Sequence, residues 1–168
     1  MKRSFDTRRL AVLSALIAVA MILSYVESQI PAFVAVPGVK IGLSNIATVF
    51  ALYTLGPSAA VTVSLVRVCL SALLFGNTVS LIYSLAGAAL ALVVMLVLMR
   101  IRLFSELGVS VGGGVAHNAG QVIAACLVME NAAISVYLAP LAVSGVIAGV
   151  AVGVASGLLV KRLEKHIK

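Results

Sequence analysis

The chain has 168 residues, of which 62% are hydrophobic and 10% are charged, and its mean hydropathy is +1.22. Soluble domains carry about 25% charged residues, so this composition excludes an ordinary soluble enzyme and indicates an integral membrane protein. The net charge of +7 does not indicate a nucleic-acid partner, because aromatic residues are not interleaved with the basic ones. The length allows a single domain, residues 1–168, with no room for a soluble enzyme beside a membrane bundle.

Apolar runs of spanning length follow one another along almost the whole chain. A transmembrane helix needs about 20 predominantly apolar residues, within a range of about 17 to 25. Six runs meet or approach this length: 10–26, 41–56, 58–75, 79–99, 107–129 and 137–160. The second run is short, and a tilted or partly re-entrant course is its alternative. The sequence therefore predicts an all-α bundle of six transmembrane helices, and the long runs lack the alternation of a β barrel.

Basic residues gather at the N-terminus, at Arg100 and Arg102, and at the C-terminus. Cytoplasmic loops of membrane proteins carry an excess of lysine and arginine. With six spans, all three basic clusters fall on one side, whereas the opposite loops hold Glu27, Glu130 and little positive charge beyond Lys40. The sequence predicts a multi-pass protein of the cell membrane with both termini in the cytoplasm.

Arg67 is the one charged residue deep inside an apolar run, the predicted third span. An ionisable group at the centre of a bilayer costs roughly 2.5–3.5 kcal/mol, and it usually marks a substrate or ion path. The sequence indicates no acidic residue at the same depth, and the five donors of an arginine suit a carboxylate or phosphate. We therefore expect Arg67 to bind an anionic ligand group; the alternative is a structural arginine that bonds to helix carbonyls.

Other polar residues fall at membrane depth on neighbouring spans. His117, Asn118 and Gln121 lie on the fifth span, and Asn45 and Tyr83 lie at comparable depths on the second and fourth. His117 and Gln121 are four residues apart, so they share one helix face. These side chains are candidates to form, with the buried arginine, a pocket open to the outside. Hydrogen bonding between neighbouring helices is the alternative role.

Glycines recur at every fourth residue of the sixth span: Gly145, Gly149, Gly153 and Gly157. A stripe of this kind lets two helix backbones approach closely. Packing inside the bundle is the favoured interpretation, and an interface with a partner protein is the alternative.

The sequence contains no motif for catalysis or for metal binding. It has no GxxxxGK[ST] motif for ATP and no Ser-His-Asp set, and Asp6 is the only aspartate, so no acidic pair can hold magnesium. A lone histidine without cysteine or carboxylate companions gives no zinc site. We expect no catalytic residue, no metal and no cofactor. The chain is instead expected to bind a small molecule and to depend on a partner for energy.

Five blocks of sequence carry a resemblance to a known family. They are residues 37–45 (PGVKIGLSN), 65–67 (LVR), 73–76 (LLFG), 83–87 (YSLAG), and the stretch from 108–111 (GVSV) to 116–121 (AHNAGQ). In this order they resemble the Gx transporter family, which is also labelled heptaprenyl diphosphate synthase component I. That family resembles the substrate-binding S components of energy-coupling factor (ECF) transporters. Such S components have six helices, capture a micronutrient from outside, and work with a membrane T component and two cytoplasmic ATPases.

The resemblance implies where ligand and partners bind. It places the ligand at the outer loops and the outer halves of the last three helices, which implicates Tyr83, Asn118, Gln121 and Tyr137. S components dock the T component through an AxxxA pattern on the first helix; Ala11 and Ala15 match this pattern.

The resemblance thus implies a non-enzymatic subunit of an importer for a small micronutrient. The family label leaves an alternative, a non-catalytic membrane subunit in isoprenoid or quinone metabolism or in associated electron transfer.

Overall fold

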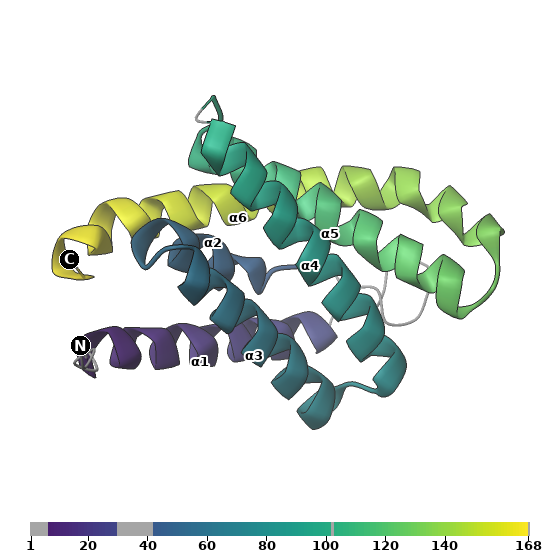
Figure 1. Ribbon diagram of the computed structural model, residues 1–168, viewed down its shortest axis with the longest axis horizontal. Helices are drawn as coiled ribbons and strands as arrows, with labels where there is room; N and C mark the ends of the chain where they lie inside the picture. Colours follow the sequence, from purple (N-terminus) through teal and green to yellow (C-terminus); the bar gives the residue numbers. More distant parts are fainter. Residues whose placement is uncertain (1–6, 30–41, 102, 168) are drawn as a thin grey trace, which may run out of the picture.

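The computed structural model describes residues 7–29, 42–101 and 103–167. Every regular element in these ranges is a helix, as the sequence predicts (Figure 1). The elements are α1 (Thr7–Gln29), α2 (Asn45–Thr54), α3 (Pro57–Phe75), α4 (Thr78–Ile101), α5 (Glu106–Val128), the 3-10 helix η1 (Ala132–Tyr137) and α6 (Leu138–Ile167). The fold class, an all-α bundle of six α-helices, is therefore confirmed for the described part of the chain.

Turn and capping residues set the ends of several helices. Gly56 has a φ of +93°, a conformation that residues with a Cβ rarely adopt. Pro57 then begins α3, where the missing N–H of a proline breaks no helix hydrogen bond. The side chain of Asn77 accepts a hydrogen bond from the N–H of Ser80 (2.8 Å) at the start of α4, and Ser105 caps α5 in the same way.

The second helix is shorter than the sequence predicts. Helix α2 has 10 residues instead of the expected run 41–56, which gives a length of about 15 Å. The hydrocarbon core of a bilayer is about 30 Å thick, so α2 alone cannot cross it. Residue 41 lies outside the described residues, and residues 42–44 form a turn.

Among the residues that the structure describes, five helical segments are long and apolar enough to cross a membrane: α1, α3, α4, α5 and the segment Ala132–Arg162, which holds η1 and most of α6. The chain is therefore a multi-pass membrane protein.

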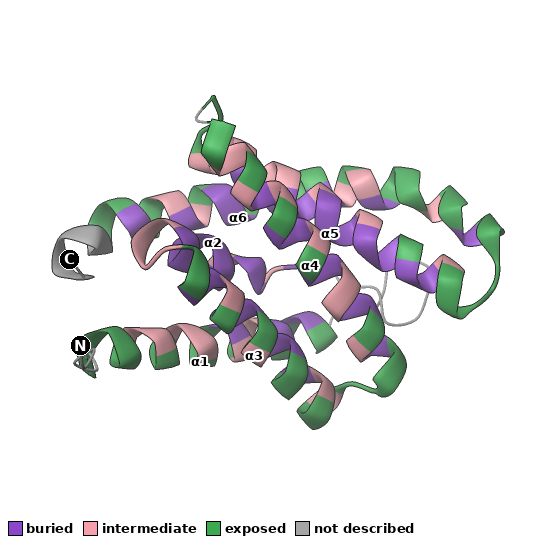
Figure 2. Ribbon diagram, viewed as in Figure 1, coloured by how far each residue is buried: buried purple, intermediate pink, exposed green. Residues whose placement is uncertain are grey.

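Helix α5 lies between α4 and α6, and α1 packs against α3 and α2. The short α2 contacts helices of both groups, because it packs against α1 and α3 and also against α6 and α5. Figure 2 shows α5 as largely buried and α1 as exposed along most of its length. In the most apolar 18-residue stretch of each helix, 56% of the α5 residues are buried but only 17% of the α1 residues.

The glycine stripe of α6 packs against α5. A Cβ atom added at Gly145 would lie 2.9 Å from the carbonyl oxygen of Gly114, and one added at Gly149 would lie 2.6 Å from the Cα atom of Val111. These neighbours are backbone atoms, so they cannot rotate away. The glycine stripe therefore packs α6 closely against α5 inside the bundle, which was the favoured interpretation of the sequence.

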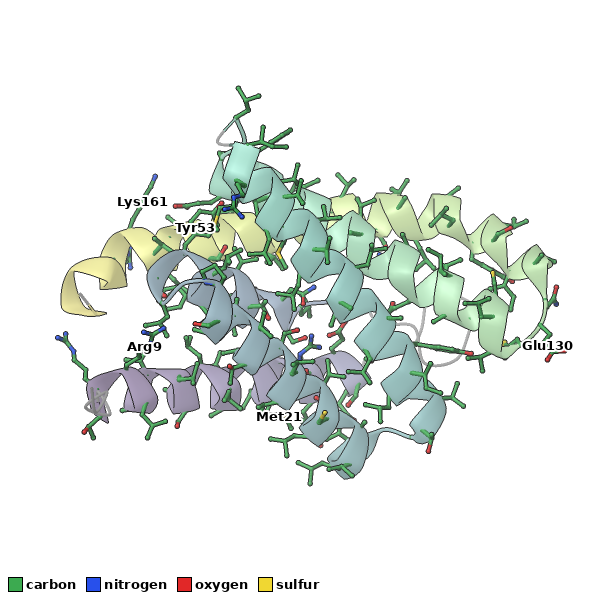
Figure 3. All side chains as sticks on the ribbon, viewed as in Figure 1. Arg9, Met21, Tyr53, Glu130 and Lys161 are labelled. Carbon is green, nitrogen blue, oxygen red and sulfur yellow. The ribbon has the colours of Figure 1, made fainter. Side chains whose placement is uncertain are left out.

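The start of α1 and the last turns of α6 lie at the same end of the bundle. Figure 3 shows Arg9 and Lys161 at this end and Glu130 at the opposite end. The guanidinium Nη2 of Arg9 donates a hydrogen bond of 3.1 Å to the carbonyl oxygen of Leu55, so the turn between α2 and α3 belongs to the same end.

Candidate functional site

Large polar side chains lie in the interior of the bundle. Six of the seven predicted ligand-binding residues are buried, and Tyr137 is half-buried. Arg67, Tyr83, His117, Asn118 and Gln121 rank among the largest side chains that are almost fully shielded from solvent. Polar groups are expensive to bury in a protein core, so this concentration requires a reason beyond packing.

The arginine lies on the face of α3 that packs against α1. The hydroxyl of Ser71, one turn further along α3, donates to the carbonyl oxygen of Arg67 (2.7 Å) and approaches the sulfur of Met21 on α1 (3.7 Å). Glu27, near the end of α1, is only 5% exposed and interacts electrostatically with Arg67.

The expectation that no acidic residue shares the depth of Arg67 is therefore wrong. Helix α1 extends to Gln29, beyond the predicted end of the span at residue 26. Its buried residues are Ala20, Ser24 and Glu27, whose spacing places them on one helix face. Glu27 is thus part of the bundle and not of an outer loop.

Glu27 also contacts the chain that leads into α2. Its Oε1 atom accepts a hydrogen bond from the backbone N–H of Gly42. A Cβ atom added at Gly42 would lie 3.0 Å from Nδ2 of Asn45 and 3.8 Å from Cδ2 of His117. Together with Arg67, these residues form a group that we call the central junction: Glu27, Gly42, Asn45, Arg67 and His117. It joins residues from α1, the start of α2, α3 and α5.

Neighbouring residues of α5 have different partners. A Cβ atom added at Gly87 on α4 would lie 2.9 Å from Cγ of Gln121 and 3.1 Å from Cε1 of His117, so both side chains lie against α4. Asn118 instead faces α6, where its Nδ2 atom donates to the carbonyl oxygen of Leu141 (2.7 Å) and to the hydroxyl of Ser144 (3.2 Å). The amide of Asn118 thus joins two helices, which was the alternative role at the sequence level.

The two predicted tyrosines come together at a different place. Tyr83 is 0% exposed and packs with Ala124, Ala125 and Ile134, and Tyr137 lies against the same cluster. This cluster is separate from the main hydrophobic core and lies under η1. The structure therefore divides the predicted site into the central junction and an aromatic cluster beneath the 3-10 helix.

Several buried polar atoms have no hydrogen-bond partner among the described residues. They include Nε and Nη2 of Arg67, the hydroxyls of Thr48, Tyr83 and Ser84, and Oδ1 of Asn118. Buried polar groups in proteins are almost always satisfied by protein or by ordered water. A polar molecule held between these helices would supply the missing partners, so the interior has the chemistry of a binding site.

One small cavity borders the central junction. A cavity of about 10 Å³, which is room for about one water molecule, lies between α2, α4, α5 and α6. Asn45 and Ser110 are the polar side chains in its lining. A ligand larger than water does not fit into this cavity unless these helices separate.

Sequence reasoning missed Glu27 and Gly42 as parts of the site. The signal for Glu27 was its spacing from Ala20 and Ser24, which places the three on one face of α1. The signal for Gly42 was weaker, because a glycine within an apolar run does not reveal that its φ is +95°.

Comparisons with known proteins give two matches. The family model described as heptaprenyl diphosphate synthase component I matches residues 16–159. A solved structure described as "Structure and mechanism of the S component of a bacterial ECF transporter" matches with a TM-score of 0.70 and 21% sequence identity. This match covers 97% of this chain and 99% of the other. The comparison with curated proteins gives no match.

Proposed function

The chain belongs to the heptaprenyl diphosphate synthase component I family and has the fold of an ECF S component, and we propose that it is the substrate-binding membrane subunit of an ATP-driven importer. The observation that carries the proposal is the similarity of fold to the ECF S component along nearly the whole length of both chains, combined with the polar interior of this bundle. In this role the chain binds a small molecule and catalyses no reaction.

The ligand is a small micronutrient or a related compound with polar groups. Two nitrogens of Arg67 lack partners among the described residues, and a guanidinium pairs well with a carboxylate or phosphate oxygen. An anionic group on the ligand is therefore favoured, although Glu27 already supplies negative charge near the arginine. Asn45, His117 and Gln121 offer further polar groups in the interior of the bundle, and Tyr83 and Tyr137 offer aromatic faces at the cluster under η1.

The proposed partners are a membrane T component and two cytoplasmic ATPases. Ala11 and Ala15 are exposed on α1, the least buried of the long helices. Two small residues four apart leave a shallow groove into which a partner helix can pack closely. This arrangement supports docking through α1. With both termini in the cytoplasm, the end of the bundle that carries Arg9 faces the ATPases.

The family description favours a second candidate, a non-catalytic membrane subunit in isoprenoid or quinone metabolism or associated electron transfer. Prenyl transfer from a diphosphate uses magnesium held by acidic side chains, and the sequence has five acidic residues with a single aspartate. The catalytic residues of such an enzyme would therefore have to come from a partner protein.

Native mass spectrometry of the chain, purified in mild detergent from its own host, separates the two candidates. The importer predicts a retained small molecule and co-purified T component and ATPases. A stable prenyltransferase partner, with no T component, would contradict the importer and support the alternative. An Ala15→Trp variant serves as the control, because it should retain the small molecule but lose the co-purified subunits.

A further inference from the structure

Glu27 lies where three parts of the bundle meet, and no role considered so far uses its carboxylate. The side chain comes from α1, accepts the N–H of Gly42 before α2, and interacts electrostatically with Arg67 on α3. It is 5% exposed. A buried carboxylate is retained only where hydrogen bonds and opposite charge compensate its desolvation. Both kinds of compensation are present here, and both lead to the candidate site.

The N–H of Gly42 bonds to a side chain from α1, and not to a carbonyl of a neighbouring turn. The φ of Gly42 is +95°, which lies outside the helical range. The carbonyl oxygen of Gly42 accepts the N–H of Asn45 at 3.0 Å, and this bond closes the turn that starts α2. Fixing the N–H of Gly42 therefore fixes the direction from which Asn45 enters the bundle.

The same turn borders the ring of His117. A Cβ atom at Gly42 would lie 3.8 Å from the His117 ring, in van der Waals contact, and 3.0 Å from the Asn45 amide, closer than ordinary contacts. The relative placement of Asn45 and His117, which come from sequence positions 72 residues apart, thus depends on the turn that Glu27 holds.

We propose that Glu27 is a positioning residue of the ligand site, which holds the Gly42 peptide and thereby sets Asn45 against His117. The positive charge of Arg67 supports this role, because it stabilises the ionised carboxylate, the stronger acceptor for a backbone N–H. The inference rests on the proposed function only in its claim that Asn45 and His117 contact the ligand. The positioning itself can be measured without any ligand.

The test compares three variants of the full-length chain in detergent micelles. Glu27→Gln keeps an oxygen that accepts the Gly42 N–H but loses the charge, and Glu27→Ala loses both. Glu130→Ala is the matched control, because Glu130 is an exposed glutamate at the opposite end of the bundle from Arg9. Two signals are recorded: hydrogen exchange of the Gly42 amide, and the ring ¹⁵N resonances of His117, one of two histidines in the chain.

Glu27→Ala should speed exchange at Gly42 about tenfold or more, the effect of losing one charge-assisted hydrogen bond, and should shift the His117 ring resonances. Glu27→Gln should restore most of the protection, and Glu130→Ala should match the wild type. The proposal is overturned if Glu27→Ala leaves both signals unchanged. If that variant fails to fold, Glu27→Gln carries the test: exchange at Gly42 should still rise measurably, because the neutral amide oxygen is a weaker acceptor than the carboxylate. A folded Gln variant with unchanged Gly42 exchange and unchanged His117 resonances overturns the proposal as well.

A parallel measurement separates this inference from the proposed function. Native mass spectra of the same variants report the occupancy of any small molecule that the wild-type chain retains. Lower occupancy in Glu27→Ala with recovery in Glu27→Gln supports both ideas. A wild-type chain that retains nothing and binds no importer subunit contradicts the importer, whereas the exchange and resonance signals still decide the role of Glu27.

Discussion

Replacing Gly87 by alanine tests the packing that places His117 and Gln121 in the site. A Cβ atom at position 87 would lie 2.8 Å from the carbonyl oxygen of His117 and 2.9 Å from Cγ of Gln121. Ordinary contacts of a Cβ atom begin near 3.4 Å, so α4 and α5 must separate by roughly 0.6 Å at this point. The carbonyl belongs to the backbone of α5 and cannot rotate aside.

The expected cost follows from two opposing effects. Overpacking of a well-packed interior costs about 1–3 kcal/mol, and the better helix propensity of alanine returns at most about 1 kcal/mol. A net destabilisation of about 1–2 kcal/mol corresponds to a fall in Tm of roughly 2–8 °C for a chain of this size. Thermal unfolding followed by far-ultraviolet circular dichroism in one detergent measures this fall.

Gly157→Ala is the matched control for this prediction. It makes the same substitution in α6, where the nearest atom to the new Cβ is Oε2 of Glu106 at 2.8 Å, the end of a flexible side chain. This variant should therefore melt within about 2 °C of the wild type. A Gly87→Ala variant that melts at or above both the wild type and the Gly157→Ala variant would refute the packing argument.

Four further predictions concern topology, docking and charge. In a chain without its native cysteines, a cysteine introduced at Val136 should react with an impermeant thiol reagent in intact cells. A cysteine introduced at Leu103 should react only after permeabilisation. The reverse pattern would contradict the predicted orientation in the membrane. An Ala15→Trp variant should abolish co-purification of the T component but keep a bound small molecule, and normal co-purification would remove α1 as the docking helix. Arg67→Met should weaken ligand retention roughly tenfold to over a hundredfold through loss of a charge-assisted contact, measured by titration of the retained compound. Adding Glu27→Gln to Arg67→Met should not lower the Tm further, because the buried carboxylate of Glu27 has already lost its cation in the single variant. A fall in Tm equal to the sum of the falls in the two single variants would contradict the coupling of the two residues.

The helical bundle was predictable because long apolar runs have few alternative structures in a bilayer. The ends of α2 were not predictable in the same way. Residues 41–44 are as apolar as a helix requires, yet Gly42 has a positive φ and starts a turn. Hydropathy reports which residues avoid water, and it contains no information about the backbone angle of a single glycine.

The candidate site was predictable in its residue types but only partly in its arrangement. The spacing of His117 and Gln121 placed both on one face, and the structure shows both against Gly87. The hydrogen-bond partners of Asn118 and Glu27 are residues that are distant in sequence. The amide of Asn118 bonds to Leu141, 23 residues away, and the carboxylate of Glu27 bonds to Gly42, 15 residues away. Periodicity along one helix cannot foresee such contacts.

The central claim, import of a small molecule driven by partner ATPases, is tested most directly by the depletion of compounds from growth medium. Three strains that contain the T component are compared. The first has this chain and active ATPases, the second lacks the chain, and the third has ATPases whose nucleotide-binding lysine is replaced. Untargeted mass spectrometry measures the compounds that remain in each medium. The account predicts that at least one small polar compound disappears only when the chain and active ATPases are both present. A medium whose composition is the same in all these strains would contradict the claim.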